Sequence, residues 1–149
     1  YERPVVLYYY LDDDEPQTID IPGHRRPIIE ETNLVSSWQT YGDAIENSIS
    51  EVEVGSEVNI ASRYWIYIDN NTNDNFKQVE IYNSNDERVD IQTSSGEQVT
   101  QNSGWQSWES YLTFYTSDWE EGAYTARMLI RDNQNQEVSE AGIVEFELV

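Results

Sequence analysis

The sequence has 149 residues, which suits one domain with an additional segment, and its 29 acidic residues against 8 Lys and Arg give a formal net charge of −21. A chain this acidic, with no basic stretch, argues against nucleic acid and anionic lipid as partners, because their phosphates would meet like charge. The absence of cysteine excludes disulfides, thiol nucleophiles and cysteine metal sites, and an aromatic content of 13% argues against disorder.

Residues 1–45 lack the regular rhythm of the rest and are predicted to form an extended arm. The apolar run Pro4–Leu11 predicts a strand on this arm, with Val6, Tyr8 and Tyr10 as candidate interface residues. Such a strand could pair with an edge of the chain's own sheet or be donated to a neighbouring subunit. The run is far shorter than the about 20 residues of a membrane-spanning helix, so no membrane insertion by this segment is expected.

His24 is the only histidine, and it lies beside Arg25 in a proline-bounded segment that is typical of a loop. A Ser/His/Asp triad would have to be built around it, yet the sequence has no Gly-x-Ser-x-Gly motif and no glycine cluster that would cradle phosphate. Paired carboxylates for glycoside hydrolysis stay open, because acidic residues occur throughout the chain. The sequence therefore nominates no catalytic residue, and we predict that the chain is not an enzyme.

Alternating apolar and polar residues predict strands from residue 58 onward. The longest covers residues 58–68, and a polar turn at 69–75 joins it to a second strand that contains Val79 and Ile81. A further turn leads to Val89 and Ile91. The residues expected on the inner face of the long strand are Val58, Ile60, Ser62, Tyr64, Ile66 and Ile68.

The turn after the long strand carries oxygen-bearing side chains at the alternate spacing of a calcium loop, with a glutamate at the distance of the last ligand. These candidate calcium ligands are Asp69, Asn71, Asn73, Asn75 and Glu80. A plain β-turn is the alternative, because Asp74 stands where such loops need glycine and because strands flank the segment. Asn70 begins an Asn-Asn-Thr sequon and is a candidate glycosylation site in an exported protein.

Five tryptophans and eleven tyrosines exceed what one small core needs, so some rings are expected at a surface or interface. Trp105, Trp108 and Tyr111 lie together near a Gly/Ser/Gln loop and are the candidates for a ligand or interface site, with a place in the core as the equal alternative for Trp105 and Trp108. Exposed rings of this kind stack on sugars or anchor protein interfaces. For Trp65 and Trp119 a place in the core is expected.

The stretch WEEGAYTARMLIRD, residues 119–132, resembles the corner and the following strand of immunoglobulin-like and fibronectin-type domains. In these families a tyrosine that enters the strand hydrogen-bonds the backbone upstream, and the resemblance implies this role for Tyr124, after Gly122. Ala126 stands where antibody domains have a cysteine, so an antibody-type domain is not expected.

The last predicted strand, residues 143–149, places Val144, Phe146 and Leu148 inward. Several short strands at this spacing predict an all-β, immunoglobulin-like antiparallel β-sandwich. We expect two parts: an N-terminal arm at residues 1–45, whose strand a neighbour could receive, and the sandwich at residues 46–149.

Acidic residues are spread over the whole chain, which favours a solvated acidic coat over a docking site for one basic partner. With only one lysine, the composition resembles that of halophilic archaeal proteins and implies a cell-surface or secreted protein. In molar salt the Debye length falls to about 3 Å, so self-repulsion of such a surface is largely screened.

These features favour a noncatalytic extracellular module that serves in structure, assembly or adhesion, as a component of a cell surface, filament or virion. A homo-oligomer or a neighbouring surface protein is the expected partner. The alternative is a carbohydrate-binding module that uses exposed aromatic residues and takes a glycan as its ligand.

Overall fold

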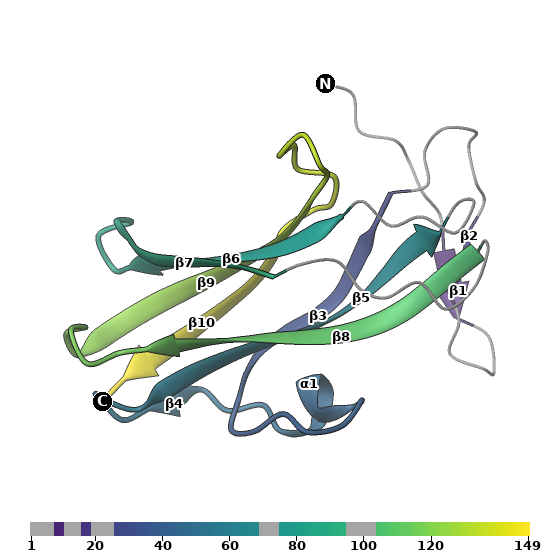
Figure 1. Cartoon of the computed structure of the whole chain (residues 1–149). Helices are drawn as coiled ribbons and strands as arrows, with labels where there is room; N and C mark the ends of the chain where they lie inside the picture. Colours follow the sequence, from purple (N-terminus) through teal and green to yellow (C-terminus); the bar gives the residue numbers. More distant parts are fainter. Residues whose placement is uncertain (1–7, 11–15, 19–25, 69–74, 95–103) are drawn as a thin grey trace.

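The computed structural model describes residues 8–10, 16–18, 26–68, 75–94 and 104–149, with side chains from residue 26 onward. These residues form an all-β, immunoglobulin-like sandwich, as the sequence predicts (Figure 1). In chain order the elements are β1 (Tyr8–Tyr10), β2 (Pro16–Thr18), β3 (Ile28–Val35), α1 (Asp43–Glu46), β4 (Glu51–Val52), β5 (Glu57–Ile68), β6 (Phe76–Asn83), β7 (Arg88–Ser94), β8 (Gly104–Tyr115), β9 (Gly122–Arg131) and β10 (Gly142–Leu148). No described helix is long and apolar enough to cross a membrane.

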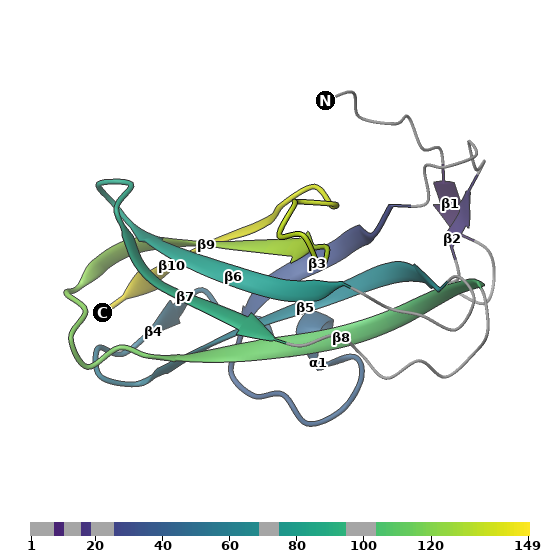
Figure 2. The same cartoon turned by 45° about the horizontal axis from the view of Figure 1, so that its top comes forward.

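The two layers are a three-stranded sheet in the order β3-β5-β8 and a five-stranded sheet in the order β4-β10-β9-β6-β7. Neighbouring strands run antiparallel, except β4 and β10, which are parallel. Helix α1 lies on the outer side of the three-stranded sheet (Figure 1). The hairpin of β1 and β2 lies at one end of the sandwich in both views (Figure 2).

The core lies between the two sheets and confirms the predicted alternation along β5. All six residues expected on the inner face of this strand are at most 2% exposed. Val79 and Ile81 face them from β6, and Phe146 and Leu148 from β10. Because each fully buried aliphatic or aromatic side chain contributes about 1.5–3 kcal/mol, this alternation supplies most of the driving force for closing the sandwich.

The turn before β9 contains the tyrosine corner that the resemblance implies. Tyr124 Oη donates a hydrogen bond of 2.7 Å to the carbonyl of Glu120. Gly122 has a φ of 140°, a conformation that favours glycine. Trp119 stacks on Tyr124 with 5.3 Å between ring centroids and packs against the core, which confirms its expected place beneath the turn.

The sandwich begins earlier than the sequence pattern indicates. Strand β3 lies within the expected arm of residues 1–45, yet it pairs with β5, and its Leu34 and Val35 are buried. The predicted boundary near residue 45 is therefore wrong. A bulge between Ile29 and Glu31 interrupts the alternation of inward and outward side chains in β3. The apolar–polar pattern of this segment therefore does not predict a strand. Within the arm, β1 pairs with β2 as a separate two-stranded sheet.

Gly142 begins β10 where this strand lies against β3. A Cβ atom at this position would overlap Thr32 Oγ1 and lie 2.9 Å from Ile29 Cγ2. Gly142→Ala should therefore lower the free energy of unfolding by about 1–3 kcal/mol, because closely packed neighbours must shift. Urea unfolding measures the loss. The double variant with Thr32→Ala should lose less than the sum of the two single changes, and an unaffected Gly142→Ala variant would contradict this packing.

Candidate functional site

A charged pair lies on the outer face of the three-stranded sheet. Arg63 on β5 and Glu109 on β8 are opposite each other in the strand register, with 2.8 Å between Arg63 Nη2 and Glu109 Oε2. The side chain of Glu109 is 1% exposed and also accepts hydrogen bonds from the amides of Gly42 (2.9 Å) and Ala44 (3.4 Å). This carboxylate therefore ties the segment around α1 to the sheet.

The surroundings of the pair keep Arg63 protonated. Burial alone would lower the pKa of Arg63, but the hydrogen bond from Arg63 to Glu109 and the electrostatic influence of Tyr41 and Glu109 raise it. The Tyr41 ring centroid lies 4.4 Å from the guanidinium carbon, which is a cation–π contact. Through the hydrogen bonds from Gly42 and Ala44 to Glu109, the pair positions the segment around α1.

Aromatic rings surround the pair. Tyr41 Oη is 2.7 Å from Ser107 Oγ, and Trp38 stacks on Tyr111 with 4.8 Å between ring centroids. Tyr41 is 57% exposed and Tyr111 is 43% exposed. We call Trp38, Tyr41 and Tyr111 the aromatic face. Stacked, partly exposed rings of this kind are typical of protein interfaces and of sugar-binding surfaces.

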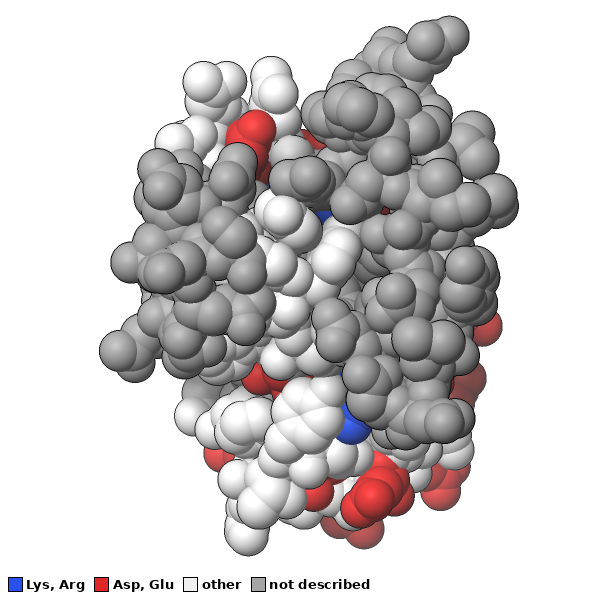
Figure 3. Space-filling model, turned by 90° about the vertical axis from the view of Figure 1, so that its right-hand side faces the viewer, with Lys and Arg blue, Asp and Glu red and all other residues white. Residues whose placement is uncertain are grey.

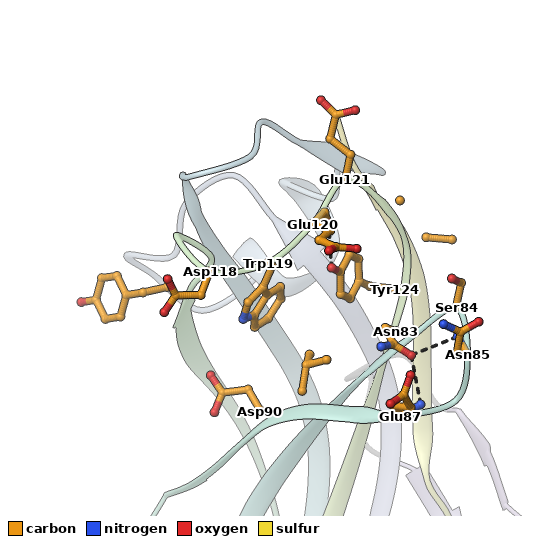
Figure 4. Close-up of a pocket in the computed structure, with 14 residues that line it drawn as sticks. Asn83, Ser84, Asn85, Glu87, Asp90, Asp118, Trp119, Glu120, Glu121 and Tyr124 are labelled. Atoms are coloured by element: carbon orange, nitrogen blue, oxygen red, sulfur yellow. Dashed lines mark hydrogen bonds between the residues drawn. The ribbon is translucent and has the colours of Figure 1, made fainter.

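An open pocket of about 670 Å³ lies between the β6–β7 turn and the segment leading into β9 (Figure 4). Trp119 and Tyr124 form part of its wall, and Asn83 Oδ1 shapes the turn by accepting hydrogen bonds from the amides of Asn85 and Glu87. The acidic residues that line it are Glu87, Asp90, Asp118, Glu120 and Glu121. This charge favours a cationic group over an anionic one. Within the described residues, no three acidic or histidine side chains converge to hold a metal ion.

An ion-pair network lies on the outer face of the five-stranded sheet. Glu80 contacts Arg88 Nη1 through Oε2 and Arg127 Nη1 through Oε1, both at 3.2 Å. Arg127 Nη1 is also 3.4 Å from Glu137 Oε1, which Arg131 Nη2 approaches to 3.6 Å. Burial alone would raise the pKa of Glu80, but hydrogen bonds from a neighbouring tyrosine and the two arginines lower it. The network therefore holds a nearly buried carboxylate in its charged form.

Every basic side chain that the structure describes is engaged within the chain or buried. Arg26 donates to the carbonyls of Val138 and Glu137, and the other described arginines belong to the ion pairs above. Lys77 is only 4% exposed. In Figure 3, red acidic side chains recur over the described part of one end of the molecule, with little blue between them. The charge presented to solvent is therefore mainly carboxylate.

The structure does not bring Trp105, Trp108 and Tyr111 onto one surface. Residues three apart on a strand face opposite sides, so Trp108 packs against the core while Trp105 and Tyr111 lie on the outer face. Trp105 meets Tyr67 edge-on, with 5.5 Å between ring centroids, further along the strand from Tyr111. The carbohydrate-binding alternative thereby loses the three-ring surface on which it rested.

Most of the other predicted site residues lie outside the described residues. These are Val6, His24, Asp69, Asn70, Asn71 and Asn73. Tyr8 and Tyr10 lie in β1, for which the structure describes the strand but not the side chains. Asn75 directly precedes β6, and Glu80 faces the two arginines of the network. The calcium loop and the glycosylation site therefore stay predictions.

Sequence reasoning missed Arg63 and Glu109 as a pair, and Trp38 and Tyr41 as parts of a surface. Arg63 lies between inward-facing residues of β5 and so points outward, but its partner lies on a strand far along the sequence. Opposite charges on the polar faces of two strands were the available signal, and only the register between the strands turns that signal into a pair.

Comparisons with known proteins identify no family. No family model matches the sequence, and no curated protein matches it. Among solved structures, a Niemann-Pick type C2 protein from the Japanese carpenter ant is similar, with a TM-score of 0.48 and 8% sequence identity, over 87% of this chain and 98% of that chain. A likeness this distant carries no argument about what the chain binds.

Proposed function

We propose that the chain is a noncatalytic extracellular module that serves in assembly or adhesion in concentrated salt, as part of a cell surface, filament or virion. The observation that carries this proposal is that the described arginine and lysine side chains do not balance the exposed carboxylates. The described basic side chains are engaged or buried, while the exposed charge is mainly carboxylate. Such a surface repels a second copy in dilute salt, and molar salt screens this repulsion. Contacts between copies therefore depend on a salty environment.

Apolar side chains exposed on both outer faces support assembly. The aromatic face exposes Tyr41 and Tyr111 on one side of the sandwich. On the other side, Ile143 is 59% exposed and Ile91 is 36% exposed. Apolar groups framed by charged residues are typical of interaction surfaces. A module that contacts neighbours through its faces accounts for both sets.

The N-terminal hairpin supports the same proposal. Strand β1 pairs with β2, and neither joins a sheet of the sandwich. A two-stranded hairpin is marginally stable by itself, and the free edge of an apolar strand is a template for another chain. We infer that the strand around Tyr8–Tyr10 is donated to a neighbouring copy. Head-to-tail donation of this kind builds open arrays instead of closed dimers.

Deletion of residues 1–16 tests the donated strand. Because the sandwich starts with β3, the shortened chain should keep its free energy of unfolding within about 0.5 kcal/mol. In molar KCl it should lose the species larger than a dimer that the full chain forms, since no strand remains to donate. Urea unfolding and sedimentation velocity measure the two properties.

A chain of full length in which Val6, Tyr8 and Tyr10 are replaced by serine is the matched control, since it keeps the arm but removes its apolar strand. This variant should sediment like the deletion. A deletion that no longer folds would mean that the arm completes the protomer's own sheet. If deletion and full chain form the same assemblies, the arm takes no part in them.

A further inference from the structure

The outer face of the five-stranded sheet carries a row of four side chains that is complementary to the same row in reversed order. Strand pairing aligns Ile91 with Glu80, Glu80 with Arg127, and Arg127 with Ile143, across β7, β6, β9 and β10. All four belong to the face that points away from the core. Read across the sheet, the row is apolar, negative, positive, apolar. When the row is placed face to face with a reversed copy of itself, each isoleucine lies opposite an isoleucine, and Glu80 lies opposite Arg127.

The next outward row has the same property. Pairing aligns Arg88 with Tyr82, Tyr82 with Thr125, and Thr125 with Glu145, across the same four strands. Reversal of this row places Arg88 opposite Glu145, and Tyr82 opposite Thr125. The Arg88 side chain is 50% exposed, and Glu145 is exposed on β10. Both rows are therefore complementary to their own reversed order.

We propose that this face is the interface of a twofold-symmetric dimer of this chain, with the axis parallel to the strands and between β6 and β9. A rotation about this axis reverses the order of the residues in each row but does not move the row along the strand direction. Each row therefore lies opposite the same row of the partner. Ile91 then meets the partner's Ile143, and Arg88 meets the partner's Glu145. The proposal deepens the assembly role above, because it names the second copy as a partner and this face as the contact.

Charge explains why a second copy would use this face. Three arginines and two glutamates form its network, so the centre of the face is close to neutral in a chain of net charge −21. Approach by other acidic surfaces of the molecule would bring carboxylates together. The Arg88 side chain is 50% exposed, so its guanidinium can reach a carboxylate of a partner while it keeps its ion pair with Glu80.

The strand arrangement suits such a contact. Sheets pack face to face at about 10 Å with strands nearly aligned, and the proposed axis leaves the strands of the two copies nearly parallel. Ile143 and Glu145 are exposed at one edge of this face, and Ile91 and Arg88 at the other, while Leu129, on the same face of β9, is buried. The two isoleucines at the ends of the first row would exclude water around the charged centre.

Because the chain has no cysteine, engineered thiols can test the interface in the full chain. The test mixes Ile91→Cys protein with Ile143→Cys protein in molar KCl and adds a short bis-maleimide. The mixture should give cross-linked dimer, while each variant alone should give little, because the axis never places two identical residues of this row together. The mixture of Ile45→Cys with Ile143→Cys is the matched control, since Ile45 is 40% exposed on α1 at the opposite side of the sandwich.

Glu145→Arg in both proteins should weaken the dimer at least about tenfold, because it places an arginine opposite Arg88. Glu57→Arg makes the same charge change on an exposed site of β5 and should leave the yield unaltered. Equal yields from the test and control mixtures would overturn the interface. If the full chain still forms larger species by sedimentation, the assembly role survives that result. A chain that stays monomeric in molar KCl would overturn both.

Discussion

In molar KCl the domain should be several kcal/mol more stable than in desalted buffer, a large part of the about 5–15 kcal/mol that stabilises an ordinary domain. The physical reason is the imbalance of 29 acidic against 8 basic residues, of which the described basic ones are engaged or buried and so do not offset the remaining carboxylates. Folding concentrates these charges, and ions screen their repulsion.

Urea unfolding at a series of KCl concentrations measures this dependence. Sucrose at matched osmotic strength is the control, because it favours the compact state by exclusion without screening charge. The free energy of unfolding should rise with KCl well beyond the rise with sucrose. A domain that is most stable after desalting would contradict both the acidic coat and the proposed salty environment.

Glu109→Gln should lower the free energy of unfolding by up to about 3 kcal/mol, because it leaves the partly buried guanidinium of Arg63 without its counter-charge. The substitution keeps the shape of the side chain. It also weakens the hydrogen bonds from the amides of Gly42 and Ala44, which lose a charged acceptor. The segment around α1 should therefore detach before the sandwich unfolds.

Two variants show whether the loss comes from an unpaired charge. Glu57→Gln removes an exposed carboxylate from the outer face of the same sheet and should change stability by less than about 0.5 kcal/mol. The double variant Arg63→Met with Glu109→Leu removes both charges and should be more stable than Glu109→Gln alone. Hydrogen exchange at the amides of residues 42–44 measures the detachment. Unchanged protection of these amides in Glu109→Gln would contradict the role of the carboxylate.

The immunoglobulin-like architecture followed from local patterns. The alternation along residues 58–68 predicted the inner face of β5, since successive side chains of any strand point to opposite sides. The tyrosine corner followed from a glycine and a tyrosine two residues apart, and Tyr124 makes the implied hydrogen bond. These features depend on neighbours in the chain, which a sequence displays directly.

The alternation of side chains along a strand also explains why the three predicted aromatic residues do not form one surface. Trp105, Trp108 and Tyr111 are near each other in sequence, but spacings of three on a strand separate them between the two faces. The ring that stacks on Tyr111 comes instead from Trp38, in the connection between β3 and β4. That contact depends on how a distant segment folds back, so no local pattern announces it.

The sequence by itself determined the strand-rich sandwich, the direction in which most side chains of the long strands point, and the large excess of acidic charge. Only the tertiary structure decided that Arg63 meets Glu109, that β3 belongs to the sandwich, and that the rows across β7, β6, β9 and β10 read the same when reversed. The reason is that the inward or outward direction of a side chain is a local property of a strand. The residue opposite it depends on the order and register of strands that lie far apart in the chain.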